Sequence, residues 1–338
     1  MNSNTPAANN IFVSLAAFVI VIAGLKASTQ LLVPFLLAVF IAVICAPLMI
    51  WLKSKKIPTP IAVFLVVAMF FLLAATFGTV IGTSLSAFYQ DLPEYEQKLQ
   101  QQSQTLIIWL QGLGLEVDSV ILSDYLDPGA AMKMVAQVFS GLGGVLTNTF
   151  LILFSVIFIL FEASDFPEKV RRALGSKTMA MDHFQRFSDS VQRYLLIKTL
   201  VSFGTGIFAG VVLAIIGVDY AVLWGLIAFL LNFIPNIGSI IAAIPPMLIA
   251  MIQLGPMSSL LVGVLYMVIN TLFGNVVEPR YMGRSLGLST LVVFVSLVFW
   301  GWVFGPVGML LSIPLTMVVK IGLENSERHR WLAVLLGH

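Results

Sequence analysis

Charged side chains are scarce in this sequence, and their scarcity narrows the class of protein. Asp, Glu, Lys and Arg make up 10% of the 338 residues, whereas 59% are hydrophobic. A soluble domain does not need that much apolar surface to build its core. The net charge is only +2, and the few basic residues lie near the ends of apolar runs, where they orient membrane proteins. We therefore expect no nucleic-acid partner.

Cysteine and histidine are also rare, which limits the chemistry available to the chain. Cys45 is the single cysteine and lies inside an apolar run, so it cannot form an intramolecular disulfide or a thiolate metal cluster. The three histidines lie outside the apolar runs. The sequence has no G-x-x-x-x-G-K-[ST] phosphate loop, so it does not predict an ATP-driven pump. We expect no metal ion, no cofactor and no enzymatic activity.

Long apolar runs are what the sequence has in abundance. A membrane-spanning helix needs about 20 apolar residues to cross a hydrocarbon layer that is ~30 Å thick. Runs of this kind, some of them shorter, occupy residues 11–25, 31–50, 59–82, 145–161, 199–218, 220–254, 257–273 and 289–319. The sequence therefore predicts an all-α, polytopic integral membrane protein.

The loops between the runs differ in charge, and the difference predicts the side of the membrane on which each lies. Residues 51–58 and 162–193 are rich in Lys and Arg, which concentrate on the cytoplasmic side. Residues 91–140 contain more acidic than basic side chains and should lie outside. Both chain termini are then expected in the cytoplasm.

The outside segment, residues 91–144, has a pattern typical of amphipathic helices. Asp127 is a favoured N-cap residue, and Pro128 suits the first position of a helix. We expect two such helices, which either rest on the membrane surface or pack on each other as a small extracytoplasmic cap.

Two of the apolar runs, 220–254 and 289–319, are too long for a single straight crossing. At ~1.5 Å per residue the first would be roughly 50 Å long, which exceeds the hydrocarbon thickness. Each run contains a Pro/Gly break, FIPNIGSIIAAIP in the first and FGPVGMLLSIP in the second, with a Trp-Gly pair upstream. These shared features predict an internal repeat with a re-entrant helical hairpin in each copy. Full crossing by both runs is the alternative.

Inverted repeats with broken helices are common in secondary transporters, and the charges here favour that arrangement. If both broken runs are hairpins, the loop 277–284 lies in the cytoplasm, as its two arginines favour; if both cross fully, it lies outside. The predicted parts are three transmembrane helices in 1–90, extracytoplasmic helices in 91–144, a fourth transmembrane helix and basic linker in 145–192, transport repeats in 193–254 and 255–323, and a cytoplasmic tail in 324–338.

Small and polar residues at the breaks are the candidate substrate pathway. Broken backbone at membrane depth is tolerated only where it is buried in protein or lines a watery cavity, and helix ends exposed there attract polar solutes. The alternative is that the asparagines only cap the broken helices. The candidates are Asn232, Pro235, Asn236, Gly238, Ser239, Asn270, Asn275, Pro306 and Gly308.

Charged residues at the ends of the apolar runs are candidates for a gate or relay. Glu278 paired with Arg280 or Arg284 would form such a gate, and a plain cytoplasmic salt bridge is the alternative. Lys198 is expected at the start of its helix, with its long side chain reaching the membrane interface. Asp219 is expected in a short interfacial turn.

Several motifs, taken in order and spacing, resemble one known group of bacterial permeases. The sequence resembles the autoinducer-2 exporter family over about residues 11–323. The resemblance implies a bacterial inner-membrane protein that exports autoinducer-2, a small hydroxylated quorum-sensing signal. It also implies a homo-oligomer, with a pentamer as the expected form. The motifs are NFIPNIG at 232–238, AIPP at 243–246, GNVVEPR at 274–280, PVG at 306–308 and SIP at 312–314.

The resemblance leaves a second substrate open, because other members of that family exchange sodium or lithium for protons. A neutral polyol needs hydrogen-bonding groups, which the asparagines supply. A cation antiporter needs a titratable carboxylate in its path, and neither Glu278 nor Asp219 lies at mid-membrane by sequence. The residues therefore favour the neutral solute. A membrane scaffold that binds partners through its outer helices is the third and least favoured interpretation.

Overall fold

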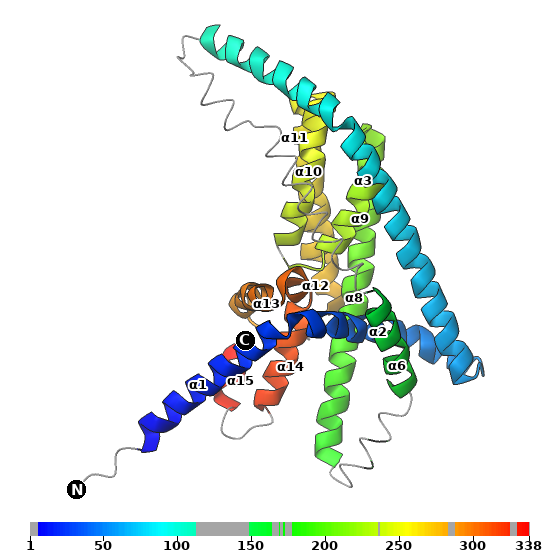
Figure 1. Cartoon of the computed structure of the whole chain (residues 1–338), viewed down its shortest axis with the longest axis vertical. Helices are drawn as coiled ribbons and strands as arrows, with labels where there is room; N and C mark the ends of the chain where they lie inside the picture. The colour runs from blue at the N-terminus through cyan, green and yellow to red at the C-terminus, as the bar shows by residue number, and fades with distance from the viewer. Residues whose placement is uncertain are drawn as a thin grey trace. The chain divides into compact units, whose positions relative to one another are not determined.

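The fold is built from helices alone in the part of the chain that the structure describes (Figure 1). This structure is a computed structural model, and it describes residues 6–112, 149–163, 169, 172, 178–235, 237–282, 288–324 and 330–337. The predicted all-α class is confirmed. Six helical segments in these ranges are long and apolar enough to cross a membrane, so the chain is a polytopic membrane protein. They are Thr29–Ser54, Thr59–Tyr95, Asp189–Ile216, Ile237–Leu254, Pro256–Tyr281 and Thr290–Leu310.

Some neighbouring helices are joined by short connections, such as α1 to α2 and α10 to α11. A π-helical segment, η1 (Thr271–Val277), joins α11 directly to α12. The bounds of the α-helices are α1 (Pro6–Ala27), α2 (Thr29–Ser54), α3 (Thr59–Gly112), α6 (Thr149–Ala163), α8 (Thr178–Ile216), α9 (Ala221–Leu231), α10 (Ile237–Leu254), α11 (Pro256–Asn270), α12 (Glu278–Met282), α13 (Thr290–Leu310), α14 (Ser312–Glu324) and α15 (Arg330–Leu336).

Several helices are longer than the apolar pattern predicts. α3 continues without interruption to Gly112, through the boundary expected at residue 90, and α8 begins at Thr178 rather than near residue 193. The helix that was expected to end near residue 273 continues through η1 and α12 to Met282. Hydropathy delimits only the part of a helix that contacts lipid, so polar extensions escape it. The amphipathic helices predicted after residue 112 lie outside the described residues.

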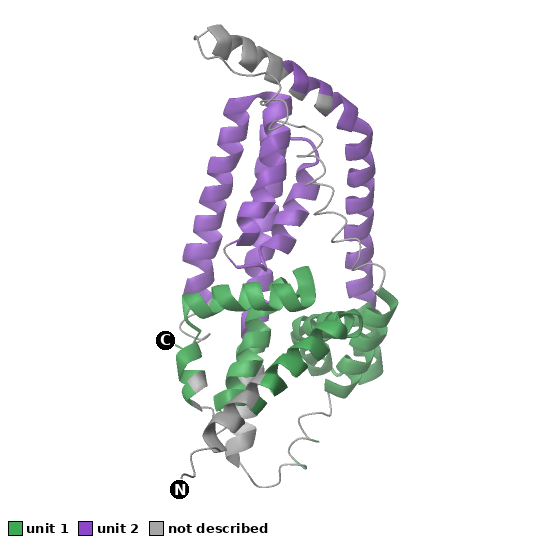
Figure 2. Ribbon diagram, turned by 60° about the vertical axis from the view of Figure 1, so that its left-hand side comes forward, with its two compact units in different colours: residues 1–67, 147–192, 286–338 green, residues 68–146, 193–285 purple. Residues whose placement is uncertain are grey.

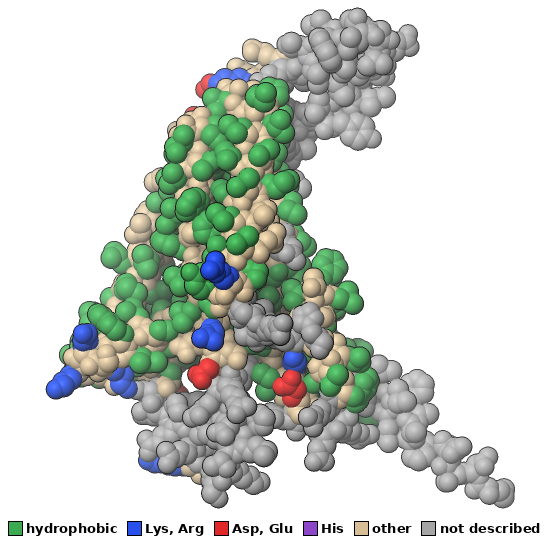
Figure 3. All heavy atoms as spheres, turned by 180° about the vertical axis from the view of Figure 1, so that it is seen from behind, with side chains coloured by type: hydrophobic (Ala, Val, Ile, Leu, Met, Phe, Trp, Pro, Cys, Tyr) green, Lys and Arg blue, Asp and Glu red, His purple; other side chains and the backbone are tan. Residues whose placement is uncertain are grey.

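The described helices form two compact units (Figure 2). Unit 1 comprises residues 1–67, 147–192 and 286–338, and unit 2 comprises residues 68–146 and 193–285. Hydrophobic side chains cover much of the face seen in Figure 3. Large apolar residues stand in the open on these helices, as on helices that face lipid; Ile215 is 80% exposed.

Unit 1 is held together where α1, α2 and α13 meet. The rings of Trp300 and Phe304 stack, with 5.7 Å between their centroids, and aliphatic side chains of α1 and α2 pack against them. At the start of α2, the hydroxyl of Thr29 donates a hydrogen bond of 3.2 Å to the carbonyl oxygen of Val303. These contacts anchor α13 just before its break.

Unit 2 has its core between α8, α9, α10 and α11, with Phe88 and Tyr95 of α3 packed into it. Trp224, Ile249 and Val262 are completely buried there. α8 and α9 approach so closely that their backbones touch: a Cβ added at Gly225 would lie 2.7 Å from the carbonyl oxygen of Gly206. Glycine at both positions permits this contact, as small residues do between membrane helices.

The first broken run folds back on itself within unit 2. α9 ends at Leu231, the chain turns, and α10 begins at Ile237. The two ends of the run meet, because the backbone N–H of Asp219 donates to Gln253 Oε1 at 3.1 Å and Gln253 Nε2 donates to Asp219 Oδ2. The run is therefore a hairpin rather than one long crossing. Its entry into the bilayer from one side stays a prediction.

The second broken run also folds back, within unit 1. Gly305 interrupts α13 with φ 66° and ψ −149°, a conformation that only glycine adopts readily, and Pro306 follows. The indole of Trp300 then donates to Thr316 Oγ1 at 3.0 Å. In a straight helix these two residues would be about 24 Å apart. The hydrogen bond between them therefore requires the chain to reverse.

The two breaks share one close contact, which supports the predicted repeat. A Cβ added at Gly238 would lie 1.8 Å from the carbonyl oxygen of Leu231, and one added at Gly308 would lie 1.9 Å from that of Trp300. In both turns a glycine lets the returning helix touch backbone. The two Trp-Gly pairs are not equivalent, because Trp300 itself makes this contact whereas Trp224 lies two helical turns before Leu231.

Candidate functional site

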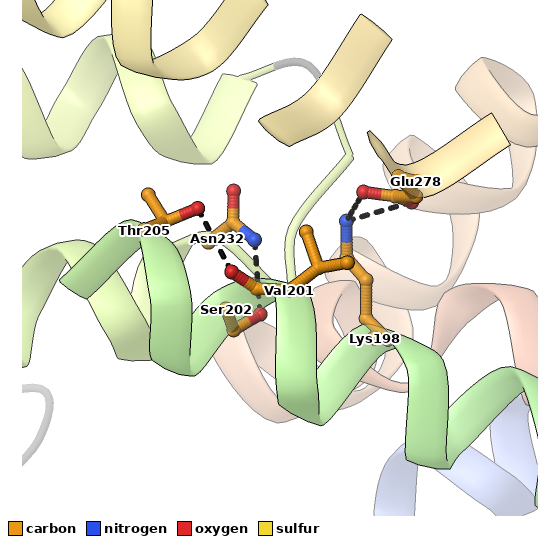
Figure 4. Close-up of polar contacts among 6 residues, drawn as sticks. All are labelled: Lys198, Val201, Ser202, Thr205, Asn232 and Glu278. Atoms are coloured by element: carbon orange, nitrogen blue, oxygen red, sulfur yellow. Dashed lines mark hydrogen bonds and ion pairs between the residues drawn. The ribbon is translucent and has the colours of Figure 1, made fainter. Parts of the chain in front are cut away.

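A stripe of polar side chains on α8 is the starting point of the site (Figure 4). Lys198, Ser202 and Thr205 have helical spacing, so they project from one face of α8. All three are buried, with 4%, 0% and 4% of their surface exposed. The prediction that Lys198 starts its helix is wrong, because α8 begins at Thr178; its side chain is buried among the described helices, and its position relative to the membrane interface stays a prediction.

Asn232 connects the first hairpin to this stripe. It follows the last residue of α9, is only 6% exposed, and donates a hydrogen bond of 2.9 Å from Nδ2 to Ser202 Oγ. Its backbone N–H continues the helix by donating to the carbonyl of Ala228 at 3.0 Å. The side-chain amide therefore binds a neighbouring helix instead of capping the broken end of its own.

The turn after Asn232 is tight, and its candidate residues have different surroundings. The backbone N–H of Ile237 donates to the carbonyl oxygen of Pro235 at 2.6 Å, and Gly238 is buried against Leu231. Pro235 and Ser239 are half-buried. Asn236 lies outside the described residues.

An ion pair lies one helical turn from Ser202. Lys198 Nζ is 2.8 Å from Glu278 Oε2 and 3.0 Å from Oε1, and only 5% and 17% of the two side chains are exposed. Each residue belongs to a helical segment long enough to cross a membrane. Removing one partner of a buried pair leaves an uncompensated charge and costs about 3–5 kcal/mol. The pair therefore fixes α8 to α12.

The partner of Glu278 differs from the predicted one. The sequence offered Arg280 or Arg284, but the carboxylate binds Lys198 of α8. Arg280 is exposed, and Arg284 lies outside the described residues. Glu278 comes two positions before Arg280, and residues two apart project from different faces of a helix, so the geometry of α12 does not favour their pairing. The plain cytoplasmic salt bridge, the other reading of these charges, stays a prediction.

The π-helix η1 leads into Glu278 and was not predicted. The backbone N–H of Glu278 bonds to the carbonyl of Phe273, five residues earlier. The Phe273 ring fills the space over Gly204, where an added Cβ would lie 2.6 Å from it. Single π-helical turns often mark functional sites. Asn275 is exposed and Asn270 is half-buried, so these two candidates do not join the Asn232–Ser202 contact.

Asp219 belongs to a separate polar cluster at the base of the hairpin. Tyr95 donates a hydrogen bond of 2.8 Å to Asp219 Oδ2, and the indole of Trp224 donates to the Asp219 carbonyl oxygen at 2.9 Å. Together with Gln253, these contacts close the hairpin and join it to α3. The short turn predicted at Asp219 is present between α8 and α9, and its place at the membrane interface stays a prediction. The last two pathway candidates, Pro306 and Gly308, form the break in unit 1.

Sequence reasoning missed the functional candidates on α8. Lys198, Ser202 and Thr205 repeat every three or four residues within an otherwise apolar segment. This spacing is a signal for a polar face inside a helix bundle, since polar residues in membrane spans turn away from lipid. The polar stripe is recognised only when the residues that share one helix face are considered together, and the sequence prediction considered Lys198 alone.

A polytopic helical protein with broken hairpins and a buried polar stripe has features typical of membrane transporters. The comparisons with known proteins give the particular family. The chain belongs to the AI-2E transporter family, whose model matches residues 15–328. It is therefore a membrane transporter of the bacterial inner membrane, and the predicted family is confirmed.

Similar proteins align along nearly their whole length. The chain is 41% identical to the AI-2 transport protein TqsA of Escherichia coli strain K12 over 326 residues, which cover 96% of this chain and 95% of that protein. It is 39% identical to a putative transport protein of Haemophilus influenzae, covering 96% and 94% of the two chains. It is 36% identical to the putative transport protein YhhT of E. coli K12, covering 97% and 94%.

Proposed function

We propose that this transporter exports autoinducer-2, the solute in the name of its relative TqsA, from the cytoplasm. The observation that carries the proposal is the buried Asn232–Ser202 contact at the tip of a hairpin. α9 has 11 residues, so Asn232 lies about 17 Å along the hairpin from its base. That is roughly half of a ~30 Å hydrocarbon layer.

The chemistry of this tip suits a small hydroxylated solute. Amide and hydroxyl groups both donate and accept hydrogen bonds without carrying net charge. Asn232, Ser202 and Thr205 offer three such groups on two helices. A solute that replaced the Asn232–Ser202 hydrogen bond with its own would satisfy both side chains. Pro235, Asn236, Gly238 and Ser239 complete the proposed path around the tip.

Flux measurements on purified protein test the proposal directly. The protein is reconstituted in liposomes loaded with autoinducer-2, and release is followed alongside sodium/proton and lithium/proton exchange. We expect release of the signal above that of protein-free liposomes. Ion exchange without signal release would contradict the proposal.

Exchange of a monovalent cation for protons is the second candidate function. Glu278 favours it, because the carboxylate is largely buried within a segment that is long enough to cross a membrane. Its pairing with a lysine argues against direct cation binding, since the ammonium already occupies the carboxylate. We therefore rank signal export first.

The proposed assembly and topology extend this function. We propose a homo-oligomer, with five copies as the expected number, both termini in the cytoplasm, and transport repeats over 193–254 and 255–323. Native mass spectrometry of the detergent-solubilised protein measures the number of copies. A monomer under conditions that preserve transport would contradict the oligomer.

A further inference from the structure

The Lys198–Glu278 pair has a chemical capacity that solute binding does not use. It joins a carboxylate to an ammonium group inside a helix bundle. Lys198 lies 18 residues before Ile216, the last residue of α8, or about 27 Å along the helix. Lys198 thus lies near the middle of α8. It is close to the end of the apolar segment of α8 that is farther from Ile216.

We propose that the Lys198–Glu278 pair is the proton-coupling site of this transporter, an inference that rests on the proposed export function. When the pair opens, a proton from the adjoining aqueous phase binds a Glu278 carboxylate oxygen, and Lys198 remains an ammonium ion. When the pair closes, that proton returns to water from the carboxyl group. One proton is bound and one released per cycle, and no other bond changes.

The burial of Lys198 makes protonation depend on conformation. A neutral Glu278 would leave the ammonium group buried without a counter-charge, so the protonated carboxyl group and the closed pair exclude each other. The nearby titratable group on α8 is Tyr194, a buried phenol close enough to interact with the charge of Glu278. Arg280, two residues further along α12, is exposed. Lys198 is thus the positive group that the carboxylate contacts.

The π-helix η1 supplies a way to open the pair. Conversion of a π-helical turn to an α-helical one shifts the following residue by one position, a rotation of about 100°. Glu278 immediately follows η1, so such a shift would turn its carboxylate away from Lys198. The Phe273 ring over Gly204 would move in the same step, because it lies within η1.

The pair is also close enough to the hairpin tip to affect solute binding. Ser202 is one turn after Lys198 on the same face of α8 and accepts the hydrogen bond of Asn232. A movement of α12 that releases Lys198 therefore acts on the helix that holds the hairpin. Proton binding at Glu278 and solute binding at Asn232 are therefore linked through a single turn of α8, from Lys198 to Ser202.

The test uses the double variant Lys198→Gln/Glu278→Gln, which leaves no unpaired charge, with Glu94→Gln as the control. Glu94 pairs with Lys98 at 2.7 Å on an exposed surface, where 65% of the glutamate side chain is exposed. Liposomes are assayed for downhill release of autoinducer-2 and for accumulation driven by a pH gradient. Infrared difference spectra between acid and neutral pH measure protonated carboxyl groups without any solute.

We expect the double variant to keep downhill release, to lose gradient-driven accumulation to the level of protein-free liposomes, and to lose one carboxyl band. Glu94→Gln should match the wild type in both fluxes. Retained accumulation, or loss of downhill release in a folded double variant, would overturn the coupling role. If the wild-type protein releases no autoinducer-2, the proposed export function fails. The proton site is then tested by the infrared spectra alone: if the wild type shows no carboxyl band that the double variant lacks, the inference is overturned.

Discussion

The close contact at Gly238 gives the sharpest prediction from this structure. In Gly238→Ala the new Cβ would lie 1.8 Å from the Leu231 carbonyl oxygen, whereas ordinary van der Waals contact begins at 3.4 Å. The hairpin must therefore open by about 1.6 Å, the difference between these two distances, before the methyl group fits. Overpacking of this kind typically costs about 1–3 kcal/mol. Backbone on the other side of the contact leaves little room to relax, so we expect the upper part of that range.

Thermal unfolding in detergent, followed by tryptophan fluorescence, measures this cost, and autoinducer-2 release from liposomes measures its effect on function. Gly78→Ala is the matched control, because nothing lies within 4 Å of a Cβ at that position of α3. Alanine favours a helix by about 1 kcal/mol over glycine, so the control should be neutral or stabilising. Gly308→Ala, with its contact of 1.9 Å, should behave like Gly238→Ala. Equal stability and equal release for Gly238→Ala and Gly78→Ala would refute the reasoning.

Three further changes test the site and the topology. Asn232→Ala should lower export more than thermal stability, because it leaves one buried hydroxyl short of a partner, at about 1–3 kcal/mol, and removes a solute contact. Lys198→Met should destabilise the protein by about 3–5 kcal/mol, and Lys198→Met/Glu278→Met should restore most of that stability in the same unfolding assay. In a Cys45→Ser background, Tyr281→Cys should resist a membrane-impermeant maleimide in intact cells and react after permeabilisation, as expected for a cytoplasmic residue.

Each of these predictions has a matched reference. Thr79→Ala removes an exposed hydroxyl of α3 and should change neither export nor stability, and equal losses of both in Asn232→Ala would indicate a purely structural amide. A double methionine variant no more stable than Lys198→Met would show that the ion pair is not what the single change breaks. For the labelling experiment, Lys55→Cys is the reference for the cytoplasmic side of the membrane, and Lys98→Cys is the reference for the outer side. Labelling of Tyr281→Cys in intact cells as fast as that of Lys98→Cys would contradict the paired-hairpin topology.

Hydropathy and Pro/Gly chemistry predicted the architecture well. The length of the runs 220–254 and 289–319, together with their breaks, favoured two chain reversals over full crossings, because backbone length and membrane thickness are both fixed. Helix ends were less predictable, as α3 and α8 show, since polar helix beyond the membrane carries no apolar signal. The fold class could therefore be predicted from hydropathy and run length, whereas the ends of the helices could not.

The chemistry of the site was harder to predict, because it depends on contacts between distant segments. Lys198 and Glu278 are 80 residues apart in the chain, and no local rule pairs them. Glu278 instead had two arginines nearby in sequence, and the one of these that the structure describes, Arg280, is exposed. The π-helix had only weak signals: Gly274 and Asn275 within an apolar helix, and Pro279, which lacks the N–H that a regular helix would use. Asn232 was predicted, but its partner Ser202 was not.

The glycine contact between α8 and α9 means that the two helices of the hairpin, α9 and α10, are packed in different ways. On one side, a Cβ added at Gly225 would lie 2.7 Å from the carbonyl oxygen of Gly206, so no side chain separates α8 from α9 at this contact. On the other side, α10 meets α11 through Met247, whose methyl group lies over Gly263. Methionine repacks easily. The α9 side of the hairpin is therefore fixed by backbone contact, whereas the α10 side is held by an adaptable side chain.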